Sequence, residues 1–230
     1  MPPAEGNKNR IPLTIDIVSD VVCPWCYVGK RRLESALRQR PQIKGEIRWV
    51  PYFLEARVPP EGMPRVDYIG QKFGVYERFT PGHERLIPLG ADVGIDFRFD
   101  RIYRQPNTLD AHRIVGWAQK SGKAGPVVER LFSMFFVEGG DLSDREMLVA
   151  AGRAGGLDSD EMRRDLLTDR DRRFVERQAN AAARAGIGGV PFFVFGKKIS
   201  VAGAHEVEVL VSAIDQALGK EKETASNSAA

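Results

Sequence analysis

Two hydrophobic patterns follow each other at the start of the chain. Residues 13–18 form a short apolar run rich in β-branched side chains, which is typical of a mostly buried strand. Apolar residues within 33–37 then recur at helical spacing until Pro41, and residues 46–53 alternate before turning aromatic, as a second strand would. The pattern predicts a β-α-β unit with parallel neighbouring strands, because such crossovers are short and right-handed. Pro51 indicates an edge or strand-end position.

The pattern becomes helical from residue 54 to about residue 168. A stretch rich in proline and glycine, residues 58–64, opens this region, and residues 126–137 carry a wide apolar face. Helix starts are indicated by capping patterns from Asn107 to Asp110, from Ser143 to Glu146 and from Asp158 to Glu161. We therefore predict a large inserted all-helical domain over residues 54–168.

The last part of the chain returns to a mixture of helices and strands. It predicts, in order, a helix at 172–185, a strand at 190–195, a hairpin turn at 196–198, a strand at 199–201 and a helix at 206–218. This α-β-β-α unit adds to the leading β-α-β unit to give a four-stranded mixed central sheet. The predicted fold class is α/β, with one domain made of residues 12–53 and 169–218 and split by the insert. The polar ends, residues 1–11 and 219–230, are expected to be disordered tails.

Composition narrows the class of protein only slightly. The chain has 230 residues, 43% of them hydrophobic and 28% charged, with a net charge of +3. Basic residues alternate with acidic ones, so we expect no nucleic-acid partner. The chain has neither a secretory signal pattern nor an apolar run near 18 residues, so we expect no membrane association and a cytoplasmic location. In that compartment a disulfide is transient and catalytic rather than structural.

The two cysteines, Cys23 and Cys26, lie where the first strand pattern gives way to the first helix pattern. Because proline at the first helical position loses no hydrogen bond, Pro24 predicts that Cys23 is the N-cap. Unpaired N–H groups and the helix dipole favour a thiolate there, so Cys23 is the predicted nucleophile. Residues three apart on a helix lie about 5–6 Å apart at Cβ, so Cys26 can resolve a mixed disulfide on Cys23.

Three other uses of the cysteines compete with this interpretation. A zinc site needs about four ligands, and His83, His112 and His205 are widely scattered. A structural disulfide across so small a loop would restrain the unfolded chain little. Two unreactive buried thiols remain an alternative. We expect neither a bound metal nor a bound cofactor, with glutathione possible only as a co-substrate.

Four stretches of the chain together resemble a known family. They are CPWCYVGK at 23–30, NTLDAHR at 107–113, EGGDL at 138–142 and GVPFF at 189–193. They resemble the DsbA family of thioredoxin-fold proteins, in particular its FrnE-like branch. That branch is related to 2-hydroxychromene-2-carboxylate isomerases and kappa-class glutathione transferases. The resemblance covers about residues 12–218.

The resemblance implies several further site residues. It implies that Val190 and Pro191 are joined by a cis peptide bond placed against the first cysteine. Proline offers no N–H, so the Val190 backbone can pair with an extended substrate. Pro24 and Trp25 would then border the substrate. His112 either lines the cleft from the insert or is a buried, hydrogen-bonded structural residue.

Some residues depart from the family pattern. Residues 202–205 read Ala-Gly-Ala-His where FrnE-like chains usually have Ser-Gly-Ala-Gln, and Phe135 stands where a tyrosine is expected. His205 is either an added proton donor or a solvent-facing residue. Trp25 carries no charge, unlike the histidine before the second cysteine of DsbA. The reduction potential is therefore expected toward about −270 mV rather than −120 mV.

The function predicted is thiol-disulfide exchange with protein or small-molecule substrates, by a monomer or homodimer. Cys23 acts as the nucleophile and Cys26 as the resolving thiol. Two alternatives stay open: a glutathione-dependent isomerase or transferase, and a binding or holdase protein without redox turnover. In the isomerase and transferase relatives a serine usually replaces the first cysteine, which counts against the first alternative.

Overall fold

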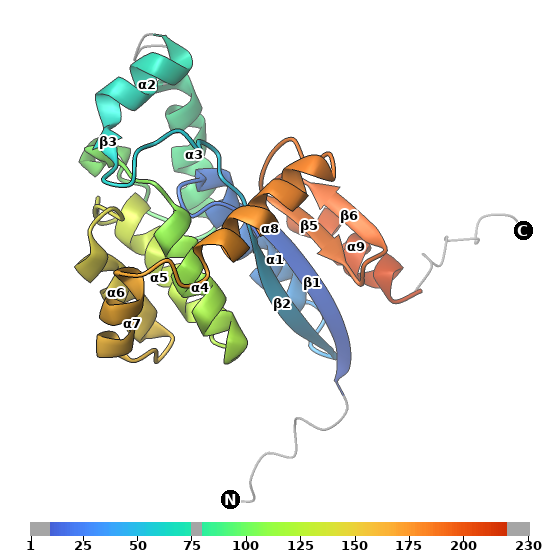
Figure 1. The fold of residues 1–230 in the computed structure, drawn as a ribbon. Helices are drawn as coiled ribbons and strands as arrows, with labels where there is room; N and C mark the ends of the chain where they lie inside the picture. Colours follow the sequence, from blue (N-terminus) through green and yellow to red (C-terminus); the bar gives the residue numbers. More distant parts are fainter. Residues whose placement is uncertain (1–9, 75–79, 220–230) are drawn as a thin grey trace, which may run out of the picture.

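A four-stranded mixed sheet forms the centre of the computed structural model, which describes residues 10–74 and 80–219 (Figure 1). The strands are β1 (Ile11–Ser19), β2 (Ile43–Pro51), β5 (Phe192–Phe195) and β6 (Ile199–Ala202), in the order β2-β1-β5-β6. β1 and β2 are parallel, and the other two pairs are antiparallel. The predicted mixed sheet is confirmed, and β2, which ends at Pro51, is an edge strand as predicted.

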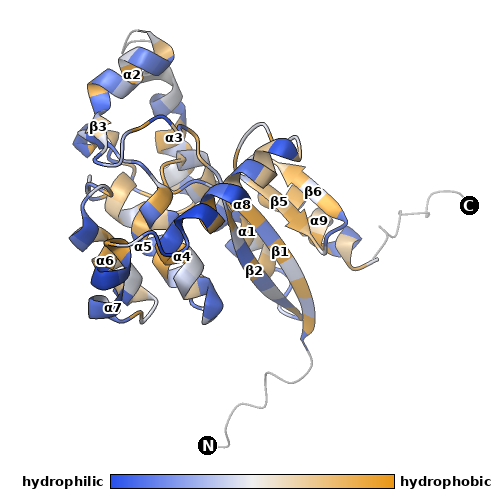
Figure 2. Ribbon diagram, in the orientation of Figure 1, coloured by the Kyte–Doolittle hydropathy of each residue, from blue (hydrophilic) through white to orange (hydrophobic). Residues whose placement is uncertain are grey.

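Three helices pack on this sheet in the predicted places. α1 (Pro24–Arg38) and α9 (Val207–Ala217) pack against each other, and α8 (Arg172–Arg184) packs against β2 (Figure 1). Figure 2 shows α8 as mostly hydrophilic and β5 and β6 as hydrophobic. α8 buries only a narrow stripe, formed by Val175, Ala179 and Ala182. The order β-α-β followed by α-β-β-α is therefore confirmed.

The region between β2 and α8 is mainly helical but not all-helical. Its helices are α2 (Arg65–Phe73), α3 (Thr80–Asp92), the 3-10 helix η2 (Phe99–Arg101), α4 (Leu109–Lys120), α5 (Ala124–Phe136), α6 (Arg145–Ala154) and α7 (Ser159–Leu166). It also contains an antiparallel pair of two-residue strands, β3 (Met63–Pro64) and β4 (Arg104–Gln105). The prediction of an all-helical insert was wrong on this point, because two residues are too few to show the period-2 pattern of a strand.

The structure also corrects one limit of the sheet domain. Ile11, predicted to lie in the N-terminal tail, begins β1, and its N–H donates to the carbonyl of Gln42 at 2.8 Å. Most of the two predicted tails, residues 1–9 and 220–230, lies outside the described residues. The proposed insert boundaries, 54 and 168, stay a prediction.

Two of the three predicted helix caps are shifted by one residue. Asp158 caps α7 as predicted, since its carboxylate accepts from the N–H of Glu161 at 2.7 Å. For α6 the cap is Asp144 rather than Ser143, because an aspartate one residue later can accept from the first turn equally well. At α4 the N-cap position is occupied by Thr108. Asn107 instead accepts from the N–H of Leu109 at 3.0 Å, as in an Asx turn.

One continuous hydrophobic core runs through the sheet and the helical region. It contains residues of β1, β2, α1, β5 and α9 together with residues of α4 to α7. At its centre Tyr27 of α1 stacks on Phe132 of α5, with ring centroids 4.9 Å apart. The helix at 124–136 is thus the central helix of the insert, as its wide apolar face predicted.

A fully buried arginine fastens α4 to the segment that leads into α8. The guanidinium of Arg113 donates to the carbonyls of Asp165, Thr168 and Arg170 at 2.7–2.8 Å and to the carboxylate of Asp110 at 2.8 Å. Because buried polar groups must be hydrogen-bonded, this one side chain satisfies carbonyls at the end of α7. It therefore fixes where the chain returns to the sheet.

Candidate active site

The cysteine pair lies at the point where β1 passes into α1. Cys23 is the N-cap of α1 in extended conformation, with φ −95° and ψ 112°, and Pro24 is the first helical residue. The turn is closed by hydrogen bonds from the N–H of Cys23 to the carbonyl of Asp20 (3.1 Å) and from the N–H of Cys26 to the carbonyl of Cys23 (3.0 Å). The predicted placement of both cysteines is confirmed.

The two thiols are free and have different surroundings. Cys23 is 3% exposed, and its Sγ donates to the carbonyl oxygen of Val190 at 3.5 Å. Cys26 is 1% exposed. Burial raises the pKa of the Cys26 thiol well above its usual value, and the neighbouring Cys23 adds to this, although the Ser19 hydroxyl and the Asp20 backbone oppose it. Cys26 is therefore held as a protonated thiol.

The loop opposite the cysteines is built around the predicted proline. Val190 and Pro191 are joined by a cis peptide bond, which confirms the expectation drawn from the family resemblance. The carbonyl of Pro191 accepts from the N–H of Gly203 at 2.8 Å, so the following hairpin holds the loop. A Cβ at Gly29 would lie 3.0 Å from the side chain of Pro191. A glycine at position 29 therefore lets α1 approach the loop without displacing the Pro191 side chain.

The other residues predicted to border or bind the substrate differ in their exposure to solvent. Trp25 is 39% exposed and Pro24 is partly exposed, so both are accessible beside the cysteines. Val190 is also partly exposed. His205 is exposed, which agrees with the alternative that it faces solvent. A substrate-binding role for these residues stays a prediction.

His112 is buried and hydrogen-bonded, which was one of its two predicted roles. Its ring is 6% exposed, and Nε2 lies 3.2 Å from the carbonyl of Tyr52 and 3.4 Å from Oδ1 of Asp20. Asp20 is 1% exposed, and its other carboxylate oxygen accepts from the N–H of Leu54 at 2.8 Å. His112 thus supports the turn that carries the cysteines, and it also lines a cavity.

Sequence reasoning missed Ser19 and Asp20 as part of this site. Ser19 lies 4% exposed at the end of β1, and both residues contact the resolving cysteine. The only signal was a polar pair at the end of an apolar strand, directly before the cysteine motif. That pattern equally fits an exposed loop, so burial was needed to assign the two residues.

Within residues 10–74 and 80–219 the structure brings together no group of histidine, cysteine, aspartate and glutamate side chains suited to a metal ion. No helix in the same residues is long and apolar enough to cross a membrane.

Fold and site together define a thioredoxin-fold protein with an adjacent Cys-x-x-Cys pair and an opposing cis-proline loop. A family model described as DSBA-like thioredoxin domain matches residues 14–215, and the chain belongs to this family. The match also fits the FrnE-like branch indicated by the sequence motifs.

Three known proteins illustrate the relationship. An uncharacterized Bacillus subtilis protein, YwbO, is 29% identical over 202 residues, which cover 87% of this chain and 94% of YwbO. The crystal structure of a probable DsbA oxidoreductase from Streptomyces coelicolor has a TM-score of 0.79 and 29% identity, and covers 94% of both chains. A 2-hydroxychromene-2-carboxylate isomerase shares the fold, with a TM-score of 0.62, 18% identity, and 88% and 95% of the two chains covered.

Proposed function

We propose that this protein is a thiol-disulfide oxidoreductase in which Cys23 is the nucleophile and Cys26 the resolving thiol. The observation that carries the proposal is the position of the Cys23 sulfur, at a helix N-cap and 3.5 Å from the Val190 carbonyl. The family membership and the similarity to a probable DsbA oxidoreductase support the same reaction class.

The reaction proceeds in two exchange steps. The Cys23 thiolate attacks one sulfur of a substrate disulfide, so that a Cys23–substrate disulfide forms and the other substrate sulfur leaves as a thiolate. Cys26 then gives up its proton to the substrate thiolate that has just left, and its own thiolate attacks the Cys23 sulfur. This forms the Cys23–Cys26 disulfide and releases the second substrate thiolate. The substrate gains two electrons, and the reverse sequence oxidises a dithiol.

The different surroundings of the two sulfurs suit this order of events. Cys26 is enclosed and its pKa is raised, so it does not compete for substrate. Cys23 lies against the exposed border formed by Trp25 and Val190. We propose that an extended segment of a protein substrate pairs with the Val190 backbone and so presents its disulfide to Cys23.

The test follows the oxidation state of both thiols in a series of glutathione redox buffers, by alkylation and intact-mass analysis. The wild type is expected to show one reversible two-electron transition. Cys26→Ser should accumulate a mixed disulfide on Cys23, whereas Cys23→Ser should accumulate none, because its remaining thiol is enclosed. Thiols that stay reduced in every buffer, or a Cys26→Ser variant that traps nothing, would refute the mechanism.

The partners and location follow as parts of the same proposal. The substrates are protein or small-molecule disulfides, glutathione serves as a co-substrate that restores the thiols, and the protein acts in the cytoplasm. Support comes from the cysteine count, since the chain has two cysteines and both belong to the exchanging pair. Regeneration of the wild-type thiols by reduced glutathione alone tests the co-substrate.

A further inference from the structure

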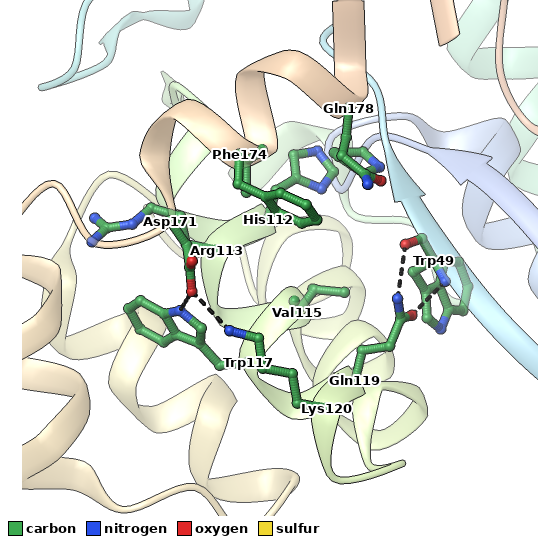
Figure 3. Close-up of a pocket in the computed structure, with 13 residues that line it drawn as sticks. Trp49, His112, Arg113, Val115, Trp117, Gln119, Lys120, Asp171, Phe174 and Gln178 are labelled. Carbon is green, nitrogen blue, oxygen red and sulfur yellow. Dashed lines mark hydrogen bonds and ion pairs between the residues drawn. The ribbon is translucent and has the colours of Figure 1, made fainter. Parts of the chain in front are cut away.

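A cavity of about 240 Å³ lies between β2, α4 and α8, and no cysteine lines it (Figure 3). Its walls are largely apolar and aromatic. They include Trp49 of β2, Val115 and Trp117 of α4, and Phe174 of α8. Phe174 is 49% exposed, an unusual position for a phenylalanine, so one wall of the cavity faces solvent. Concave apolar sites with a few polar groups are the usual form of small-molecule sites.

The middle of α4 carries a glycine at this cavity. Glycine in a helix interior costs about 1 kcal/mol relative to alanine. A Cβ added at Gly116 would meet no neighbouring heavy atom within 4 Å, so close packing does not require the glycine. Gly116 is one of the residues that line the cavity, and the missing side chain keeps this space open.

Several polar groups of the lining already have partners. The side-chain amide of Gln119 accepts from the N–H of Trp49 at 2.6 Å and donates to the carbonyl of the same residue at 3.4 Å. Asp171 accepts from Trp117 and from Lys120, both at 3.0 Å. Figure 3 draws both clusters with dashed lines, the Asp171 cluster on the left and the Gln119 cluster on the right. A ligand would gain little from them without breaking existing hydrogen bonds.

His112 is the buried polar group of the lining that can still accept a hydrogen bond. Its Nε2 faces the carbonyl of Tyr52, which can only accept, so Nε2 carries the hydrogen. In the neutral ring Nδ1 is then an acceptor, and it has no partner within the described part of the chain. The side chain as a whole is 6% exposed, and Nδ1 is not among the fully enclosed side-chain atoms that lack a partner, so it can be reached from the cavity. A ligand in this cavity that carries an O–H or N–H group can supply the missing hydrogen bond.

We propose that this cavity binds a planar, fused-ring aromatic small molecule that donates one hydrogen bond to His112. An enclosed apolar cavity of about 150 Å³ holds benzene, so about 240 Å³ is sufficient for two fused rings. The aromatic side chains of Phe174 and Trp49 in the lining favour a flat, aromatic ligand. The site is separate from the cysteine pair and does not depend on the proposed exchange reaction.

The test uses isothermal titration calorimetry with the full-length protein and 2-naphthol as the probe. Its comparison ligand is 2-methoxynaphthalene, which has the same ring system but cannot donate a hydrogen bond. We expect 2-naphthol to bind about tenfold more tightly, since loss of one buried hydrogen bond is worth roughly that factor. Equal binding of the two compounds, or no binding of 2-naphthol up to its solubility limit, would overturn the proposal.

Two matched glycine variants locate the site. Gly116→Leu places a side chain in the cavity and should weaken 2-naphthol binding at least about tenfold. Gly125→Leu is the control, because Gly125 is an exposed glycine of α5 whose Cβ also meets nothing within 4 Å. Both variants should retain thiol exchange. Undiminished binding of 2-naphthol by folded Gly116→Leu would also overturn the proposal. If that variant does not fold, the comparison of 2-naphthol with 2-methoxynaphthalene on the wild type still tests the proposal.

Discussion

A single helical turn gives Cys23 and Cys26 different chemistry. Both sulfurs belong to residues that are at most 3% exposed, but Cys23 borders the accessible residue Trp25, whereas Cys26 points toward Ser19 and Asp20. Transfer of a thiolate into such an enclosed position is costly, so ionisation of Cys26 is disfavoured. The inner cysteine therefore becomes reactive only when a disulfide partner is already beside it.

The pH dependence of alkylation tests this difference. In Cys23→Ser, the rate at which iodoacetamide modifies Cys26 should keep rising about tenfold per pH unit beyond pH 9. A thiol with an ordinary pKa near 8.5 levels off there, because the thiolate is the reacting species. The raised pKa of Cys26, caused mainly by burial, sets this expectation. A plateau below pH 9 in the folded variant would contradict it, and the urea-unfolded variant provides the ordinary profile.

The sequence was informative about the reacting residues and less so about the residues that surround and support them. The positions of Cys23, Cys26 and the cis bond at Pro191 could be predicted, because N-caps, spacing and family motifs are local features. The contributions of Ser19 and Asp20 could not, since they depend on which polar side chains become enclosed. The same holds for the cavity at Gly116, which needs three separate elements to form.

At the scale of elements, a charged cluster joins α1 to α5. Glu129 of α5 accepts from Lys30 at 2.6 Å, from Arg31 at 2.5 Å and from the hydroxyl of Tyr27 at 2.8 Å. Burial opposes the ionisation of Glu129, but the bonds and charges of Lys30, Tyr27 and Arg31 outweigh it and hold its pKa below the usual value. Lys30 is 6% exposed, so its charge depends on such a partner.

Glu129→Gln should lower the free energy of unfolding by about 1.5–3 kcal/mol, the range for hydrogen bonds to charged groups, and toward the lower end because the Glu129 side chain is 31% exposed. A carboxyl group whose pKa is lowered on folding stabilises the folded state at pH values above its pKa in the unfolded chain. The difference from wild type should therefore be constant above about pH 5 and shrink as the pH falls below about 4.3.

Urea titrations at several pH values measure this difference. Glu146→Gln is the matched control, because its pair with Arg163 is a surface contact, and it should leave the unfolding midpoint unchanged. Equal effects of the two substitutions, or an effect of Glu129→Gln that does not change in acid, would show that the α1–α5 cluster is not a stabilising link.

Element types were easier to predict than element ends. The long helices and the four sheet strands were predicted correctly, because each carries a full hydrophobic period. The caps at Asp144 and Thr108 were displaced by one residue, since neighbouring polar side chains compete for the same N–H groups. The strand pair β3 and β4 had no signal at all.

At the scale of the whole molecule, the sheet and the helical region share one core. Buried residues of β1 and of α5 belong to the same cluster, and the Tyr27–Phe132 stack crosses between the two parts. Separate domains would each need a core of their own. The chain is thus better described as one folding unit with an intimately packed insert.

Equilibrium unfolding of the reduced protein should therefore be a single cooperative transition. Far-UV circular dichroism and tryptophan fluorescence are expected to give coincident urea curves with the same midpoint. Two of the tryptophans, Trp49 and Trp117, lie on opposite sides of the boundary between β2 and α4. Curves that separate would mean that the insert unfolds on its own.

The contact between Cys23 and Val190 spans 167 positions of the chain. Ribosomes add about 5–20 residues per second, so Cys23 is made roughly 8–33 seconds before the residue that will face it. During that interval the nascent chain presents both thiols without the strands β5 and β6 that complete the sheet. Until translation is nearly complete, the two thiols of the nascent chain can therefore themselves react with thiols and disulfides around it.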